Sequence, residues 1–94
     1  MTKADLVSDI AHKTGINKEE VLTTVEAIMA SISNALATGD NVYMRGFGSF
    51  IVKERAAKVG RNISKNTEVF IPAHNAPAFK PAKEFVEAVK LNVK

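Results

Sequence analysis

The sequence predicts an α+β fold: two N-terminal helices, a three-stranded antiparallel sheet that extends into a long hairpin, and one C-terminal helix. Apolar residues recur every three or four positions in residues 2–38 and again in residues 82–91, which is the spacing of helices. Between these regions, strand-like runs are separated by glycines and polar residues. Residues 53–65 are rich in lysine and arginine and cannot be buried in a core, so they predict a hairpin that projects from the sheet.

Length and composition favour one small globular domain. The chain has 94 residues, of which 46% are hydrophobic, and we expect a single domain over residues 1–94. It contains no cysteine, which excludes disulfides, thiolate metal sites and a cysteine nucleophile. No apolar run approaches the roughly 18 residues of a membrane span, and the N-terminus does not resemble a signal peptide. We therefore expect a cytoplasmic protein without a membrane partner.

Capping residues predict where the two N-terminal helices begin and end. Thr2 can cap the first helix together with Asp5, and Gly15 ends it. Asn17 can cap the second helix, which Gly39 closes at a position that favours left-handed backbone.

The second helix carries more apolar surface than the first helix can cover. A homodimer that shares one core is the simplest explanation, and residues 1–40 would then be its helical dimerisation part. The alternative is that the sheet covers this surface within one monomer.

Three strands are expected between the second and the last helix. Residues 41–44 predict a short strand, and residues 45–49 predict a turn with two glycines. The runs 50–59 and 68–73 predict the two sides of a hairpin, with residues 60–66 as its polar tip.

Residues 41–81 would therefore form the sheet and a basic arm, the arm covering about residues 53–76. Pro77 and Pro81 are expected to interrupt the chain path before the last helix, which lies within residues 82–94. Side chains alternate along a strand, so we expect one face of the sheet to carry Phe50, Val52 and Glu54 and the other to carry Ile51, Lys53 and Arg55.

Charge is divided unevenly along the chain. Residues 1–40 carry three cations and six acids, a net charge of −3, whereas residues 41–94 carry ten cations and four acids, a net charge of +6. The first half would then be a scaffold, and the second half would meet a polyanion, with nucleic acid as the leading candidate. The alternative is that the basic composition has no functional meaning, because basic isoelectric points are common.

Several segments resemble the HU/integration host factor family of bacterial DNA-bending proteins. They are Arg45-Gly46-Phe47-Gly48-Ser49-Phe50, Gly60-Arg61-Asn62, Ile71-Pro72-Ala73 followed by residues 77–83, and the opening Thr2-Lys3-Ala4-Asp5-Leu6. Their spacing fits the family without gaps over essentially the whole chain. The resemblance implies an intertwined dimer with a helical base, a saddle-shaped sheet and two β-arms. It also implies a histone-like, nucleoid-associated protein that binds double-stranded DNA in the minor groove, with little sequence specificity, and bends or compacts it.

The resemblance assigns roles to individual residues. Phe47, Phe50 and Phe79 would belong to the dimer core. The residues that would lie near phosphates along the saddle are Lys3, Lys80 and Lys83. The residues that would follow the DNA backbone or the minor groove from the arm are Arg45, Lys53, Arg55, Lys58, Arg61, Asn62 and Lys65.

Ile63 stands where the family usually has proline at the tip of the arm. Isoleucine is one of the apolar side chains that can wedge between base pairs and so bend the duplex. It lacks the fixed φ of proline, so the tip would be less preorganised. The alternative is that Ile63 is an exposed loop residue or only stiffens the arm. Nicked, gapped or pre-bent DNA would be the preferred partner, because such DNA is already deformed or easily deformed.

The residues indicate neither a catalytic site nor a cofactor or small-molecule substrate. His12 and His74 are the only histidines, too few for a metal site in a chain without cysteine. Both are expected to be solvated, although His74 could contact DNA from the saddle. Two other functions stay open. One is a site-specific subunit like integration host factor, which could form a heterodimer, and the other is a basic dimeric scaffold that binds RNA or an acidic protein.

Overall fold

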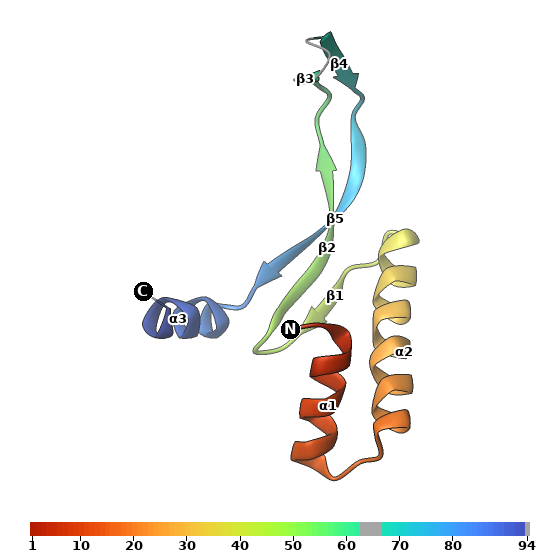
Figure 1. Cartoon of the computed structure of the whole chain (residues 1–94). Coiled ribbons are helices and arrows are strands. Elements are labelled where there is room, and N and C mark those ends of the chain that lie inside the picture. The colour runs from red at the N-terminus through yellow and green to blue at the C-terminus, as the bar shows by residue number, and fades with distance from the viewer. Residues whose placement is uncertain (63–66, 94) are drawn as a thin grey trace. The chain divides into compact units, whose positions relative to one another are not determined.

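A computed structural model of the chain describes residues 1–62 and 67–93, and Figure 1 shows the course of the chain. Two compact units can be distinguished, residues 1–35 and residues 36–94, and each is described by itself. The elements in chain order are α1 (Lys3–Thr14), α2 (Lys18–Ala37), β1 (Val42–Met44), β2 (Gly48–Arg55), β3 (Lys58–Asn62), β4 (Thr67–Ile71), β5 (His74–Pro81) and α3 (Lys83–Asn92).

The first unit contains α1 and most of α2, which lie side by side as an antiparallel pair (Figure 1). The predicted capping box is present at the start of α1. The Thr2 hydroxyl accepts a hydrogen bond from the Asp5 backbone N–H at 3.3 Å, and the Asp5 carboxylate accepts one from the Thr2 backbone N–H at 2.9 Å. These bonds satisfy N–H groups that have no partner within the helix and so fix where α1 begins.

The other predicted helix ends are also confirmed. Gly15 has the left-handed conformation after α1, and the Asn17 side chain accepts a hydrogen bond of 2.7 Å from the Glu19 backbone N–H at the start of α2. Gly39, just beyond α2, has a φ of 89°. Local signals therefore set the length of both helices.

The helical unit buries little of its apolar surface in the single chain. Among the described residues, the buried apolar side chains are Val7 and Val21. By contrast, Leu6, Ile28 and Met29 are each about half exposed. In the described part of the chain, these apolar side chains therefore stay partly exposed to solvent.

The second unit contains two antiparallel ladders, a three-stranded sheet with the order β1-β2-β5 and a two-stranded ribbon of β3 and β4, here called the outer ribbon. The ladder between β2 and β5 ends at the pair Arg55 and His74, and the ladder between β3 and β4 begins at Lys58 and Ile71. Residues 56–57 and 72–73 lie between the ladders and are here called the joint. Figure 1 shows the outer ribbon continuing beyond the joint.

Three sequence expectations about the sheet need correction. The described strands number five rather than three, because the joint divides the predicted run 50–59 between β2 and β3, and because β5, which follows the predicted run 68–73, was not expected as a strand. Residues 60–62, expected in the polar tip, belong to β3. The expectation that Pro77 and Pro81 interrupt the chain path is wrong, because both lie within β5. β5 is an edge strand, where a proline without an N–H can be accommodated.

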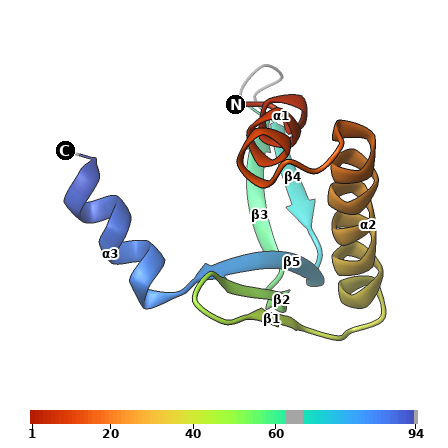
Figure 2. The same cartoon turned by 90° about the horizontal axis from the view of Figure 1, so that it is seen from below.

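An aromatic cluster forms the apolar side of the second unit, where the sheet meets α3. The ring centroid of Phe79 lies 4.9 Å from that of Phe50, 5.2 Å from that of Phe47 and 6.1 Å from that of Phe85. Phe47 and Phe85 stack at 5.3 Å. Figure 2 shows α3 following β5 at the end of the sheet.

Two glycines bring the turn between β1 and β2 close to this cluster. Gly46 has a φ of 81°, which side chains other than glycine rarely adopt. Gly48 is buried, and a Cβ atom there would lie 2.6 Å from the Phe79 ring and 2.6 Å from the Lys80 carbonyl oxygen. The Gly-Phe-Gly segment is therefore needed for close packing at this end of the sheet.

Candidate nucleic-acid interface

The strand register separates basic from aromatic side chains onto opposite faces of the three-stranded sheet. Residues directly opposite each other in a ladder point to the same face, and neighbours along a strand point to opposite faces. Phe50 pairs with Phe79, and both rings lie on the face here called the aromatic face. The other face is here called the cationic face, and its residues are Tyr43, Ser49, Ile51, Lys53, Arg55, His74, Ala76, Ala78 and Lys80.

This arrangement confirms the predicted alternation in β2, and it places a predicted saddle residue, Lys80, on the same face as the arm residues. Lys53 and Arg55 come from β2, whereas Lys80 comes from β5 and pairs with Ser49. Within the described residues, the ion pairs are Lys3 with Glu26 and Lys13 with Asp9, so these three cations form no ion pair with another described residue. Their charges are available to an external anion.

Small side chains lie between the cations. Ala76 pairs with Lys53 and Ala78 pairs with Ile51, so the β5 side of the cationic face has methyl groups where longer side chains would stand up from the sheet. A rigid polyanion could therefore approach the backbone closely between the basic residues. Figure 2 shows the sheet and the outer ribbon from below.

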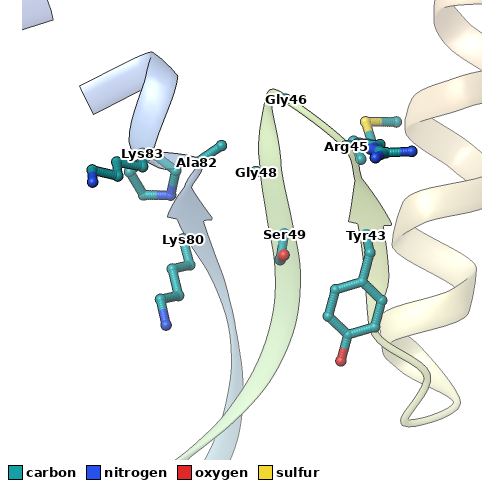
Figure 3. Close-up of a pocket in the computed structure, with 10 residues that line it drawn as sticks. Tyr43, Arg45, Gly46, Gly48, Ser49, Lys80, Ala82 and Lys83 are labelled. Carbon is teal, nitrogen blue, oxygen red and sulfur yellow. The ribbon is translucent and has the colours of Figure 1, made fainter. Parts of the chain in front are cut away.

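The cationic face is hollowed at the end nearest α3. The hollow is lined by residues of all three strands and of the start of α3, including the cations Arg45, Lys80 and Lys83 (Figure 3). Tyr43, Ser49 and Lys80 lie in one row across β1, β2 and β5, as their register requires. The hydroxyl groups of Tyr43 and Ser49 can donate hydrogen bonds to the same kind of anion that the lysines would attract.

A second hollow lies beside the joint. It is lined by Arg55, Lys58 and His74 together with the small residues Ala56, Ala57 and Ala76. The Nδ1 atom of His74 lies 2.9 Å from the Pro72 carbonyl oxygen, so this nitrogen carries the proton in the neutral ring. The Nε2 atom is then free to contact a ligand. His74 is exposed, as the sequence predicted.

The outer ribbon carries the remaining predicted arm residues. Lys58 opens β3, and the backbones of Arg61 and Asn62 pair with Glu68 and Thr67. Ile63 and Lys65, the predicted wedge and the last predicted arm cation, lie outside the described residues.

Lys3 belongs to the first unit, at the start of α1. Its Nζ atom lies 3.1 Å from a Glu26 carboxylate oxygen, and both side chains are about half exposed. The pair is therefore an exposed ion pair of small energetic value, which an external phosphate could replace.

The residues predicted for a dimer core lie together. Phe79 contacts both Phe47 and Phe50 on the aromatic side of the sheet, and Phe85 of α3 contacts Phe47 and Phe79. Phe47 remains 46% exposed and Phe79 39% exposed in the single chain. The cluster is thus incomplete without additional covering atoms.

Sequence reasoning missed Tyr43 and Ser49 as members of the cationic face. The signal existed in part, because both alternate with apolar neighbours along their strands. Their alignment with Lys80 depends on the pairing between strands, which one strand's pattern does not reveal.

No group of three histidine, acidic or cysteine side chains in the described part of the chain could hold a metal ion. In that same part, no helix has the length and apolar character needed to cross a membrane.

Comparisons with known proteins agree with this geometry. Residues 1–90 match the family described as bacterial DNA-binding protein. The SPbeta prophage-derived DNA-binding protein HU 2 of Bacillus subtilis (strain 168) is 48% identical over 90 residues, which are 96% of this chain and 98% of the relative. DNA-binding protein HU of Geobacillus stearothermophilus is 44% identical over 90 residues, which are 96% of this chain and 100% of the relative.

A solved structure extends the likeness to the backbone. A chain from the Anabaena HU–DNA cocrystal structure is 36% identical, with a TM-score of 0.85 and coverage of 100% of both chains. The expected α+β fold is therefore confirmed. The chain belongs to the family of bacterial DNA-binding proteins that includes HU.

Proposed function

We propose that this chain is a histone-like architectural protein that binds double-stranded DNA as a dimer, with little sequence specificity. In this proposal two basic β-arms grip the minor groove, and the duplex is bent or compacted against the protein. One observation carries the proposal. The register places Lys53, Arg55 and Lys80 on one face of the sheet and the aromatic side chains on the other.

The chemistry of the cationic face explains the expected lack of specificity. Lysine and arginine on phosphates release condensed counterions, which supplies affinity without reading the base sequence. The methyl groups of Ala76 and Ala78 allow the duplex backbone to approach the sheet between the cations. In the minor groove the hydrogen-bond pattern is nearly degenerate, so arms that lie there discriminate little between sequences.

The second copy of the chain supplies the missing cover for apolar surface. The aromatic cluster is incomplete in the single chain, and the α1–α2 pair leaves Leu6, Ile28 and Met29 about half exposed. Burying such surface contributes roughly 25 cal/mol per Å², which favours association of a chain this small. A homodimer would also present two arms, one on each side of the duplex.

The arm residues take the remaining roles in this proposal. Lys58 and Arg61 contact the DNA backbone from the outer ribbon, and Asn62 lies in the groove beside them. Ile63 wedges between base pairs, a role that rests on its apolar character and on its position after Arg61-Asn62. Lys65 adds a further phosphate contact, and Lys3, Arg45 and Lys83 contact phosphates along the protein body.

The proposal assigns no catalytic role and no cofactor to the chain. A protein with this activity would act on the nucleoid in the bacterial cytoplasm, which is where we place it.

A salt titration of DNA binding tests the proposal. Affinity would be measured at several salt concentrations for intact, nicked and pre-bent duplexes of one sequence, and the bend angle would be measured in parallel. We expect a steep, linear fall of log affinity with log salt, tighter binding to nicked and pre-bent duplexes, and a bend in the intact duplex. Binding that is independent of salt, or a duplex that stays straight, would contradict the proposal.

Competition experiments distinguish the other candidate functions. A random duplex that competes as well as any chosen site, at fixed salt, argues against a site-specific subunit like integration host factor. Single-stranded DNA, RNA and an acidic protein would be added as further competitors. Stronger competition by RNA or by the acidic protein than by duplex DNA would favour the scaffold function instead.

A further inference from the structure

We propose that Tyr43 is a DNA-contacting residue whose hydroxyl group donates a hydrogen bond to a phosphate, and that Asn41 sets the direction of this bond. The inference rests on the proposed function, which it deepens by adding an uncharged contact to the cationic face. Neither residue carries charge, and neither was indicated by the sequence.

The position of Tyr43 is the first argument. It pairs with Ser49, which pairs with Lys80, so the three side chains form one row on the cationic face. All three also line the hollow at the end of the sheet (Figure 3). Tyr43 is 73% exposed, an unusual degree for a large aromatic side chain in a sheet. A phosphate held by Lys80 and its neighbours would lie within the region that this row borders.

The hydrogen bonds of Asn41 are the second argument. Its Oδ1 atom accepts a hydrogen bond of 2.9 Å from the Val52 backbone N–H, which fixes which end of the amide faces β2. The Nδ2 group consequently faces the other way and donates to the Tyr43 hydroxyl oxygen at 3.3 Å. The hydroxyl oxygen therefore accepts a bond from the protein, and its own hydrogen is left to donate elsewhere.

The free hydroxyl hydrogen of Tyr43 makes this residue a neutral hydrogen-bond donor suited to a phosphate oxygen. A phosphate oxygen accepts hydrogen bonds and cannot donate them when ionised, so a preset donor matches it. Because the donor is neutral, its contact releases no counterion from the DNA. Tyr43 should thus contribute to affinity but not to the salt dependence of affinity, in contrast to Lys80.

The test combines Tyr43→Phe with Asn41→Asp and with the double variant, in the full-length dimer. Tyr43→Phe removes only the hydroxyl group. Asn41→Asp keeps an acceptor for the Val52 N–H but cannot donate to Tyr43, so the hydroxyl hydrogen would turn inward to the carboxylate. Duplex affinity is measured for wild type and the three variants over the same salt series, and thermal unfolding is measured for each protein.

We expect Tyr43→Phe to weaken duplex binding about tenfold for each hydroxyl group lost, the value of a hydrogen bond to a charged group, and so about a hundredfold in the dimer, with an unchanged salt slope. Asn41→Asp adds a negative charge that weakens binding in any background. Its effect should be larger by about the same factor in the wild type than in the Tyr43→Phe background, because only the wild type has the hydroxyl group to misdirect.

Three results would overturn the inference. They are equal affinity of Tyr43→Phe and wild type, a lowered salt slope in Tyr43→Phe, or equal effects of Asn41→Asp in both backgrounds. Failure of the proposed function itself looks different, because then the wild-type protein would show no salt-dependent binding to duplex DNA at all.

Discussion

Replacing Gly48 with alanine should destabilise the fold because this position has no room for a Cβ atom. The added carbon would lie 2.6 Å from the Phe79 Cζ atom, 2.7 Å from its Cε1 atom and 2.6 Å from the Lys80 carbonyl oxygen. The ring cannot turn aside freely, since Phe47 and Phe50 pack on it with centroid distances of 5.2 and 4.9 Å. The carbonyl belongs to β5, directly beside β2. Relief therefore requires the strand and the cluster to move together.

Two opposing effects set the change in the free energy of unfolding that Gly48→Ala should cause. Overpacking of this kind costs about 1–3 kcal/mol. Alanine also lowers the conformational entropy of the unfolded chain, which offsets about 0.4–1 kcal/mol. A net loss of roughly 1–2 kcal/mol should lower the Tm by about 4–16 °C in a chain of this size.

Gly60→Ala provides a matched control within the outer ribbon. A Cβ atom there would lie 3.5 Å from the Ile71 Cδ1 atom and 3.8 Å from the Val69 carbonyl oxygen, which are ordinary contacts. Only the lower conformational entropy of the unfolded chain should then matter, and Gly60→Ala should raise the free energy of unfolding by about 0.4–1 kcal/mol. The two substitutions are chemically identical, yet we expect opposite signs.

Thermal and urea unfolding at one fixed protein concentration would measure both variants, because the stability of a dimer depends on concentration. Combining Gly48→Ala with Phe79→Leu tests the cause. Gly48→Ala should lower the free energy of unfolding less in the Phe79→Leu background than in the wild type, because leucine is smaller than phenylalanine. Part of the loss should remain, because the contact with the Lys80 carbonyl is unchanged. If Gly48→Ala is as stable as Gly60→Ala, the packing argument is wrong.

Three further predictions concern charge, pH and bending. Lys53→Ala removes two cations per dimer and should lower the salt slope of duplex binding by about 1.8, whereas Lys90→Ala in the last turn of α3 should leave the slope unchanged. The hydrogen bonds from the Thr2 backbone and side chain lower the pKa of Asp5 below its ordinary value of 3.8, so they stabilise the fold above that pH. The stability difference between wild type and Asp5→Asn, followed by Tm against pH, should be full near neutral pH and disappear as the pH falls through the lowered pKa. Ile63→Ala should keep most of the affinity for nicked duplex DNA but reduce the bend angle, and an unchanged angle in a fluorescence transfer assay would refute its wedge role.

Local signals in the sequence were sufficient for the helices and for one strand. Thr2 with Asp5, and Gly39, predicted helix ends because capping depends on residues a few positions apart. The faces of β2 followed from alternation alone.

Features that depend on strand pairing could not be predicted in the same way. Nothing local distinguishes Ala56 and Ala57 from a continuing strand. The break is explained by the opposite side of the hairpin, which carries Pro72. Proline has no N–H to donate to the ladder. Pro77 was taken as an interruption because its tolerance depends on the edge position of β5. The place of Tyr43 beside Ser49 likewise depends on the register between β1 and β2.

The joint has a consequence for how such arms can diverge among related proteins. The outer ribbon continues the register of β2 and β5, but its ladder is separate, because the pairing of β2 with β5 ends at Arg55 and His74 and that of β3 with β4 begins at Lys58 and Ile71. Inserting or deleting one residue on each strand of the outer ribbon would change the reach of the arm by about 3.3 Å, while every side chain of β2 and β5 kept its face. Arm length sets how much DNA the arm can contact, and the side chains of β2 and β5 set the chemistry of the surface that the DNA contacts. Mutations can therefore change one of these properties without changing the other.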